Sequence, residues 1–150
     1  MERLPYIDVH EVEVEADVDA AWRALVAVAL GSLGGVGHGR LGQALRVDPP
    51  HASGRWSPEP EEGAALPGFV VEEVRPAELL ALRGGHRFSR YRLEFELAAA
   101  GDDPGRSLLR ARSWAEFPGP AGAAYRALVI GSGGHRLVVR RMLRRIAAAA

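Results

Sequence analysis

FSRYRLEFEL, residues 88–97, has the clearest strand pattern in this chain. Apolar side chains at Tyr91, Leu93, Phe95 and Leu97 alternate there with arginines and glutamates. An alternation with a period of two residues places one kind of side chain on each face of a strand. The stretch therefore predicts a strand with one dry and one wet face, which is typical of an antiparallel sheet.

The same pattern recurs on both sides of this stretch. Residues 107–117 also alternate, with Leu109, Ala111 and Ser113 on the apolar face, and GDDPG at 101–105 is a turn signal between two strands. The chain therefore predicts several consecutive antiparallel strands. Further strands are expected at residues 8–15, 68–75 and 79–82, the last of them ending at Gly84-Gly85.

Helical patterns flank the strands. Asp17 is a favourable N-cap residue for a helix that we expect to end at Gly31. Residues 121–150 also have a helical pattern, which Gly131 to Gly134 should kink or interrupt. Both helices have one apolar face, because their apolar residues recur at helical spacing. These faces consist of Trp22, Leu25, Val26 and Ala29 in the first helix, and of His135, Val139, Met142, Leu143 and Ile146 in the second.

Residues 31–67 are the least regular part of the chain, because glycine and proline recur throughout them. Residues 41–47 fit either a short strand or one or two helical turns. Residues 55–57 are expected to form a short strand, and residues 58–63 a solvated turn.

These elements predict one α+β domain over residues 1–150. A sheet with one apolar face needs a cover, and the C-terminal helix is the only predicted element long enough. A curved antiparallel sheet wrapped around this helix leaves a gap that is a natural pocket.

The chain resembles the helix-grip superfamily, known as START-like or SRPBCC, which includes polyketide cyclases and lipid-transfer domains. The resemblance rests on HEVEVEADVDAAW at 10–22, EEVRP at 72–76 and RMLRRI at 141–146, and on the order of the elements. It spans roughly residues 7–147, and residues 31–66 match most poorly.

The resemblance implies an elongated, mostly apolar cavity between the sheet and the C-terminal helix. We therefore expect the protein to bind a hydrophobic small molecule such as a lipid or polyketide. The resemblance carries over no catalytic residue, and we expect no cofactor and no metal. The residues predicted to line the cavity are Val12, Val14, Tyr91, Leu93, Phe95, Leu109, Ala111, Ser113, Tyr125, Leu128, His135 and Val139.

Two other functions remain open. One is an enzyme of the same superfamily, a cyclase, dehydratase or hydrolase, that uses His10 or His135 on the inward face. The sequence shows no base next to Ser113 or Ser132, which argues against a serine nucleophile. The other is an interaction module that binds an anionic partner through the C-terminal arginines, although we favour the interpretation that they form a solvated helix face. These arginines are Arg136, Arg140, Arg141, Arg144 and Arg145.

Composition and short motifs argue against several other classes of protein. The chain has no Cys and a net charge of +0, so it offers no disulfide and no argument for nucleic acid. GHGRLG at 37–42 follows a helix rather than a strand, so we interpret it as a loop and not a dinucleotide site. The longest apolar run is too short to span a membrane, and the N-terminus lacks a secretory pattern. We expect a cytoplasmic bacterial protein, with a homodimer through Trp114 as one alternative for its oligomeric state.

Overall fold

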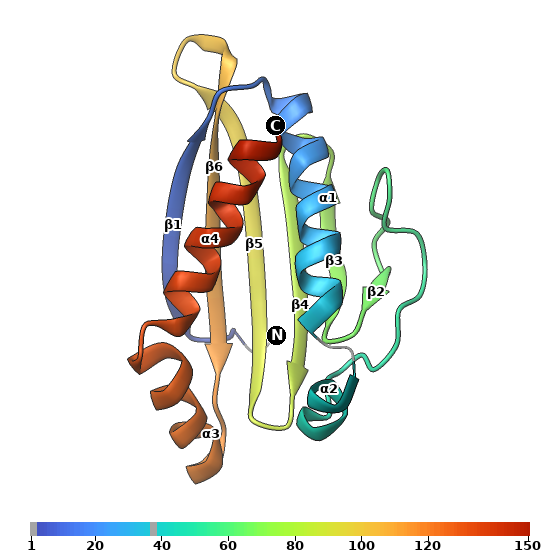
Figure 1. Ribbon diagram of the computed structural model, residues 1–150, viewed down its shortest axis with the longest axis vertical. Helices are drawn as coiled ribbons and strands as arrows, with labels where there is room; N and C mark the ends of the chain where they lie inside the picture. Colours follow the sequence, from blue (N-terminus) through green and yellow to red (C-terminus); the bar gives the residue numbers. More distant parts are fainter. Residues whose placement is uncertain (1–2, 37–38) are drawn as a thin grey trace.

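The computed structural model describes residues 3–36 and 39–150, and it places a curved antiparallel sheet behind a layer of helices (Figure 1). The described strands form one six-stranded sheet in the order β1-β6-β5-β4-β3-β2. This architecture confirms the α+β helix-grip prediction. The strands are β1 (Tyr6–Val14), β2 (Ala65–Leu66), β3 (Phe69–Arg75), β4 (Leu79–His86), β5 (Ser89–Ala100) and β6 (Asp103–Glu116). The helices are α1 (Val18–Val36), α2 (Gly39–Leu45), α3 (Gly119–Arg126), the π-helical turn η1 (Ala127–Gly131) and α4 (Gly134–Ala149).

The strand register puts the alternating apolar residues into shared rows. Leu93 lies opposite Leu82 of β4 and Ser113 of β6, and Ser113 lies opposite Asp8 of β1. Directly paired residues of antiparallel strands project from the same face. Asp8 therefore extends the apolar row on the inner face. The pairing register shifts between Tyr6 and Asp8, where β1 has one residue more than β6.

Two helices, and not one, cover the inner face of the sheet. α1 and α4 lie side by side in front of it (Figure 1) and contact each other and the strands. Trp22, Leu25 and Ala29 of α1 are buried in the same core as Leu143 and Ile146 of α4. The prediction that the C-terminal helix alone is the cover was wrong, because it judged α1 too short.

α1 is longer than expected and continues past Gly31 to Val36. Leu33 is buried against the core in this extra part, and its burial offsets much of the roughly 1 kcal/mol that each helical glycine costs. By length and apolar composition, Val18–Gly35 would also suit a membrane span. In this fold its apolar face packs against the sheet instead, as in the core helix of a globular protein.

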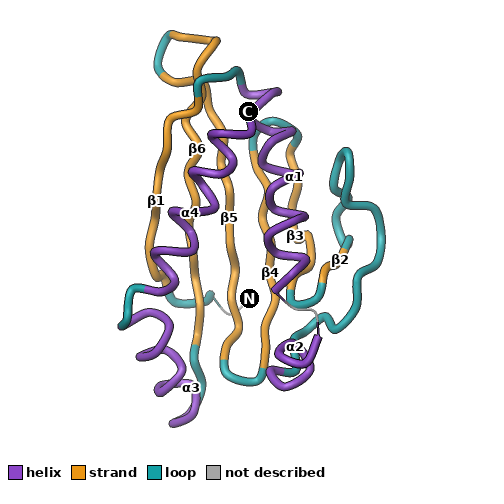
Figure 2. The backbone as a smooth tube through the Cα atoms, in the orientation of Figure 1, coloured by secondary structure: helices purple, strands orange, loops and turns teal. Residues whose placement is uncertain are grey.

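The prediction that this strand ends at Gly84-Gly85 was wrong, because β4 continues through both glycines to His86. Gly85 pairs with Arg90 of β5 on one side and forms an isolated β-bridge with Asp48 on the other. Residues 41–47, left open by the sequence, belong mainly to α2. Residues 55–57 do not form the expected strand and lie in a long loop before β2 (Figure 2).

That loop is attached to α1 by two tryptophans. Trp22 Nε1 donates a hydrogen bond to Glu59 at 3.0 Å, and the buried Trp56 contacts the Val26 carbonyl oxygen at 3.4 Å. At the other end of the chain, the predicted break at 131–134 is confirmed. Gly133 precedes α4 in a left-handed conformation, with a φ of 79°, after the π-helical turn.

Candidate functional site

A cavity of about 270 Å³ lies between the inner face of the sheet and the helices. Its lining residues come from the end of the sheet where α4 begins and α1 ends. The two helices diverge at this end (Figure 1). Leu93 and Ala115 form part of its sheet wall, Val139 and Met142 come from α4, and Leu33 comes from α1. Most lining side chains are apolar or aromatic, so the cavity suits an apolar molecule.

The structure brings together about half of the predicted lining residues. The predicted residues that line the cavity are Tyr91, Leu93, Ser113, Tyr125, His135 and Val139. Five others lie in the hydrophobic core beside it or, in the case of the partly buried Val12, pack against that core, because α1 and the far half of α4 cover that part of the sheet. These five are Val12, Val14, Phe95, Leu109 and Ala111. Leu128 lies in the π-helical turn with 70% of its surface exposed and is not part of the cavity wall.

Sequence reasoning missed several residues of the cavity wall. Ile7 is the additional residue at the β1 irregularity, and an alternating pattern does not predict such an insertion. Leu45 and Val47 come from residues 31–67, the least regular part of the sequence. Val129 and Ile130 face the cavity because the π-helical turn changes the helical phase. Phe69 is the first residue of β3, and the apolar run of that strand could have predicted it as a lining residue.

An aromatic group lies at the α3 side of the cavity, where Tyr125, His86 and Phe117 line it. The Tyr125 ring stacks on Phe88 at 5.5 Å between centroids and meets His86 edge-on at 4.7 Å. Phe117 lies 6.2 Å from the same ring. Burial raises the pKa of Tyr125 and lowers the pKa of His86, so both side chains favour their neutral forms.

Tyr91 supplies a polar group on the opposite wall. Its hydroxyl donates a 2.7 Å hydrogen bond to the Gly68 carbonyl oxygen. Burial, and then the charges of Tyr125 and Asp48, raise the pKa of Tyr91 well above its ordinary value. The hydroxyl therefore stays protonated, and its oxygen can still accept a hydrogen bond from a ligand.

A polar cluster lies where β1, β6 and α4 meet. His135 Nε2 is 3.2 Å from Ser113 Oγ and 3.5 Å from Asp8 Oδ1, and His10 Nε2 is 3.1 Å from Asp8 Oδ2. The sequence showed no base next to Ser113, and the fold places His135 there. His135 and Ser113 line the cavity, whereas Asp8 and His10 are not among its lining residues. In the described residues, no three His, Asp or Glu side chains are placed to hold a metal ion.

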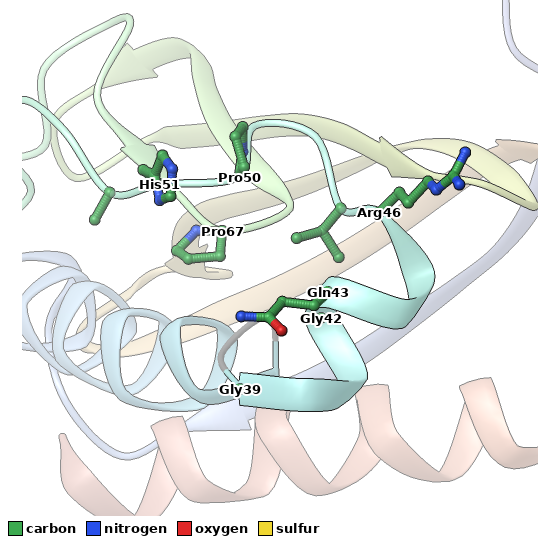
Figure 3. A pocket seen from close by; sticks show the side chains of 9 residues that line it. Gly39, Gly42, Gln43, Arg46, Pro50, His51 and Pro67 are labelled. Atoms are coloured by element: carbon green, nitrogen blue, oxygen red, sulfur yellow. The ribbon is translucent and has the colours of Figure 1, made fainter.

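A second hollow of about 410 Å³ lies on the surface between α2 and the following loop (Figure 3). Gln43 reaches toward Pro67 across it, while Arg46 extends away. Gly37 and His38 of the glycine motif lie outside the described residues. Gly39 to Gly42 belong to α2, where the motif had been interpreted as a loop.

The remaining surface candidates are Trp114, which is also among the residues that line the cavity, and the arginines of α4. The Trp114 ring contacts Tyr6 edge-on, and the Arg92 guanidinium lies over it, with Cζ 5.1 Å from the ring centroid. Residues of the same chain therefore partly cover Trp114. Arg140 and Arg144 are exposed on α4, and residues 119–150 contain no Asp or Glu. Binding of an anionic partner by this helix and a homodimer through Trp114 stay predictions.

No family model matches the chain, and no curated protein matches it. Solved structures do match it over nearly their whole length, at identities that establish the fold alone. A protein from Nitrosospira multiformis has a TM-score of 0.59 at 15% identity, over 96% of this chain and 94% of that one. A START superfamily protein from Mycobacterium smegmatis has a TM-score of 0.57 at 12% identity, with coverages of 97% and 99%. A truncated norcoclaurine synthase from Thalictrum flavum also has a TM-score of 0.57, at 13% identity and coverages of 98% and 96%. The chain therefore has a START-like helix-grip fold.

Proposed function

We propose that this protein binds a compact, mainly apolar small molecule in the cavity between the sheet and α4. The observation that carries the proposal is the cavity itself, a hollow of about 270 Å³ with apolar walls and a few polar groups. Clefts lined mainly by apolar and aromatic side chains, with a few polar groups among them, are the usual form of a small-molecule site.

The volume limits the ligand. It lies just below the range of roughly 300–1,000 Å³ that is usual for pockets that hold drug-sized molecules. A molecule with one or two rings, or a short acyl chain, suits it better than a sterol or a long lipid. The polar groups of Tyr91, Ser113 and His135 would orient such a ligand through one oxygen atom.

The solved relatives support the binding of a small molecule without choosing a reaction. One is described as a synthase and another only as a START superfamily protein. Because the same fold serves different functions, the chemistry must be argued from the side chains of this cavity.

A cavity-filling substitution tests the proposal. Leu93→Trp would place an indole in the cavity, and we expect it to weaken the binding of nitrobenzene, a compact apolar probe, at least about tenfold. Leu41→Trp makes the same chemical change on an exposed part of α2, and it should bind as the wild type does. Isothermal titration calorimetry on the three proteins gives the comparison. Equal affinity of the Leu93→Trp variant and the wild type would contradict the assignment of this cavity.

Native mass spectrometry of the purified protein then addresses the natural ligand. We expect a small apolar molecule to remain bound under native conditions and to be released on denaturation. Its mass would restrict the ligand class directly.

A further inference from the structure

The polar cluster beside the cavity is assembled from three distant parts of the chain. Asp8 and Ser113 face each other across β1 and β6, and His135 reaches them from the first turn of α4. Ser113 is 4% exposed, and the side chains of Asp8 and His135 are 22% and 26% exposed. The cluster is therefore mostly removed from solvent, and two of its members form part of the cavity wall.

Asp8 has one unsatisfied oxygen. Its Oδ2 is paired with His10, but its Oδ1 is buried and accepts no hydrogen bond from the described residues. His135 Nε2 lies 3.5 Å from this oxygen, which is beyond good hydrogen-bond distance. A buried acceptor without a partner typically costs about 1–3 kcal/mol. A positive charge on His135 would compensate this oxygen directly.

The tautomer of His135 follows from its neighbours. An ionised carboxylate only accepts hydrogen bonds, so Asp8 favours the form with a proton on Nε2. Ser113 Oγ, 3.2 Å from the same nitrogen, can accept from that N–H as well. The other ring nitrogen, Nδ1, then has a free lone pair, because the hydrogen bond of His135 to a described residue uses Nε2.

We propose that His135, supported by Asp8, is a proton acceptor on the cavity wall, and that the ligand is an apolar molecule with a weakly acidic hydroxyl, such as a phenol. This inference rests on the proposed function, since it specifies the ligand of the same cavity. The ligand O–H bond breaks and an N–H bond forms at His135 Nδ1. The ligand is left as an oxyanion, and the imidazolium is paired with the Asp8 carboxylate.

The other titratable groups near the cavity are less suited to this role. His10 also contacts Asp8, but it is not part of the cavity wall. Tyr91 and Tyr125 hold their protons firmly, because burial raises the pKa of each. His86 Nδ1 accepts the Phe88 amide N–H at 3.1 Å, and Arg92 is already paired with Glu72 and Glu94. His135 alone of these described groups combines access to the cavity with a carboxylate behind it.

Para-nitrophenol provides a direct test, because its phenolate is yellow and its phenol is colourless. Nitrobenzene, which lacks the hydroxyl, is the matched probe for cavity binding alone. At a slightly acidic pH, where free para-nitrophenol is mostly colourless, we expect its complex with the wild-type protein to be yellow. In Asp8→Asn and His135→Gln, the yellow fraction of the bound para-nitrophenol should fall about tenfold. Nitrobenzene titrations of the same variants measure any change in cavity affinity separately, so that the fraction refers to bound probe only. Asp102→Asn and His51→Gln, at exposed positions, should keep the wild-type spectrum.

The outcomes separate the two proposals. Para-nitrophenol bound without colour, beside normal nitrobenzene binding, overturns the proton acceptor and leaves the binding function intact. A yellow complex that persists in Asp8→Asn overturns the role of Asp8, and one that persists in His135→Gln overturns the role of His135. If neither probe binds to the wild type, the proposed function fails and this inference fails with it.

Discussion

At the scale of single residues, the closest backbone approach near the cavity depends on Gly84. A Cβ atom at this position would lie 1.8 Å from the Gly68 carbonyl oxygen and 3.2 Å from the Tyr91 ring. The same carbonyl accepts the Tyr91 hydroxyl hydrogen bond. The absence of a side chain at position 84 thus allows the β2–β3 turn, β4 and Tyr91 to meet.

We expect Gly84→Ala to destabilise the protein by about 1–3 kcal/mol, because the backbone must shift to make room for the methyl group. Gly31→Ala is the matched control. Its Cβ would meet no atom within 4 Å, and alanine in a helix should stabilise by up to about 1 kcal/mol. Urea unfolding of both variants measures the two free energies. A Gly84→Ala variant as stable as the wild type would contradict the close approach.

At the scale of elements, α3 is held mainly by aromatic contacts. It has only eight residues, and its Pro118 N-cap provides no side-chain hydrogen bond. Tyr125 contacts His86, Phe88 and Phe117, which belong to β4, the β4–β5 turn and the chain after β6. An isolated helix of this length is unstable in water, so these contacts decide whether α3 stays in place.

Tyr125→Ala should therefore loosen α3 without unfolding the sheet. We expect amide hydrogen exchange across residues 119–131 to become faster by about tenfold or more, since aromatic pairs contribute roughly 0.5–1.5 kcal/mol each beyond their burial. Tyr125→Phe, which keeps the ring, should exchange almost as the wild type does. Hydrogen exchange measured by mass spectrometry distinguishes these results, and equal acceleration in β5 would show that the effect is global instead.

On the outer face of the sheet, arginines pair with glutamates of neighbouring strands, and the whole sequence has equal numbers of basic and acidic residues, 19 each. Arg110 pairs with Glu11 at 2.6 Å, and Arg112 pairs with Glu96 at 2.8 Å, across neighbouring strands. Such exposed pairs contribute little stability each. They make the outer face charged and wet, which favours the sheet in the orientation with its apolar face toward the helices.

At the scale of the whole molecule, stability should depend on pH through His86. Burial lowers its pKa in the folded protein below the ordinary value of 6.5. Below about pH 6.5 the unfolded chain therefore binds a proton more readily than the folded chain does, and the free energy of unfolding decreases as the pH falls. Above that pH both states are neutral at this residue, and its contribution is constant.

His86→Gln removes this proton linkage while it keeps a polar side chain. We expect its free energy of unfolding to decrease less than that of the wild type between neutral and mildly acidic pH. Urea unfolding at a series of pH values measures the difference. Parallel pH profiles for the two proteins would show that His86 does not contribute.

The sequence by itself determined the dry and wet faces of the strands, the start of α1 and the break before α4. These features depend on neighbouring residues, because the alternation in residues 88–97, the Asp17 cap and the run of glycines at 131–134 act locally. The Asp17 carboxylate accepts the Ala20 amide hydrogen bond at 2.8 Å, as its position predicted. The order of these elements was also sufficient to indicate the helix-grip fold.

Only the tertiary structure decided which inward residues line a cavity and which are packed solid. Phe95 and Leu93 have the same pattern in sequence and both belong to the core, yet only Leu93 also lines the cavity, because α1 covers one end of the sheet and diverges from α4 at the other. Asp8, Ser113 and His135 likewise meet only through the strand register and the position where α4 begins. Their contacts join residues more than twenty positions apart, and no local periodicity carries that distance.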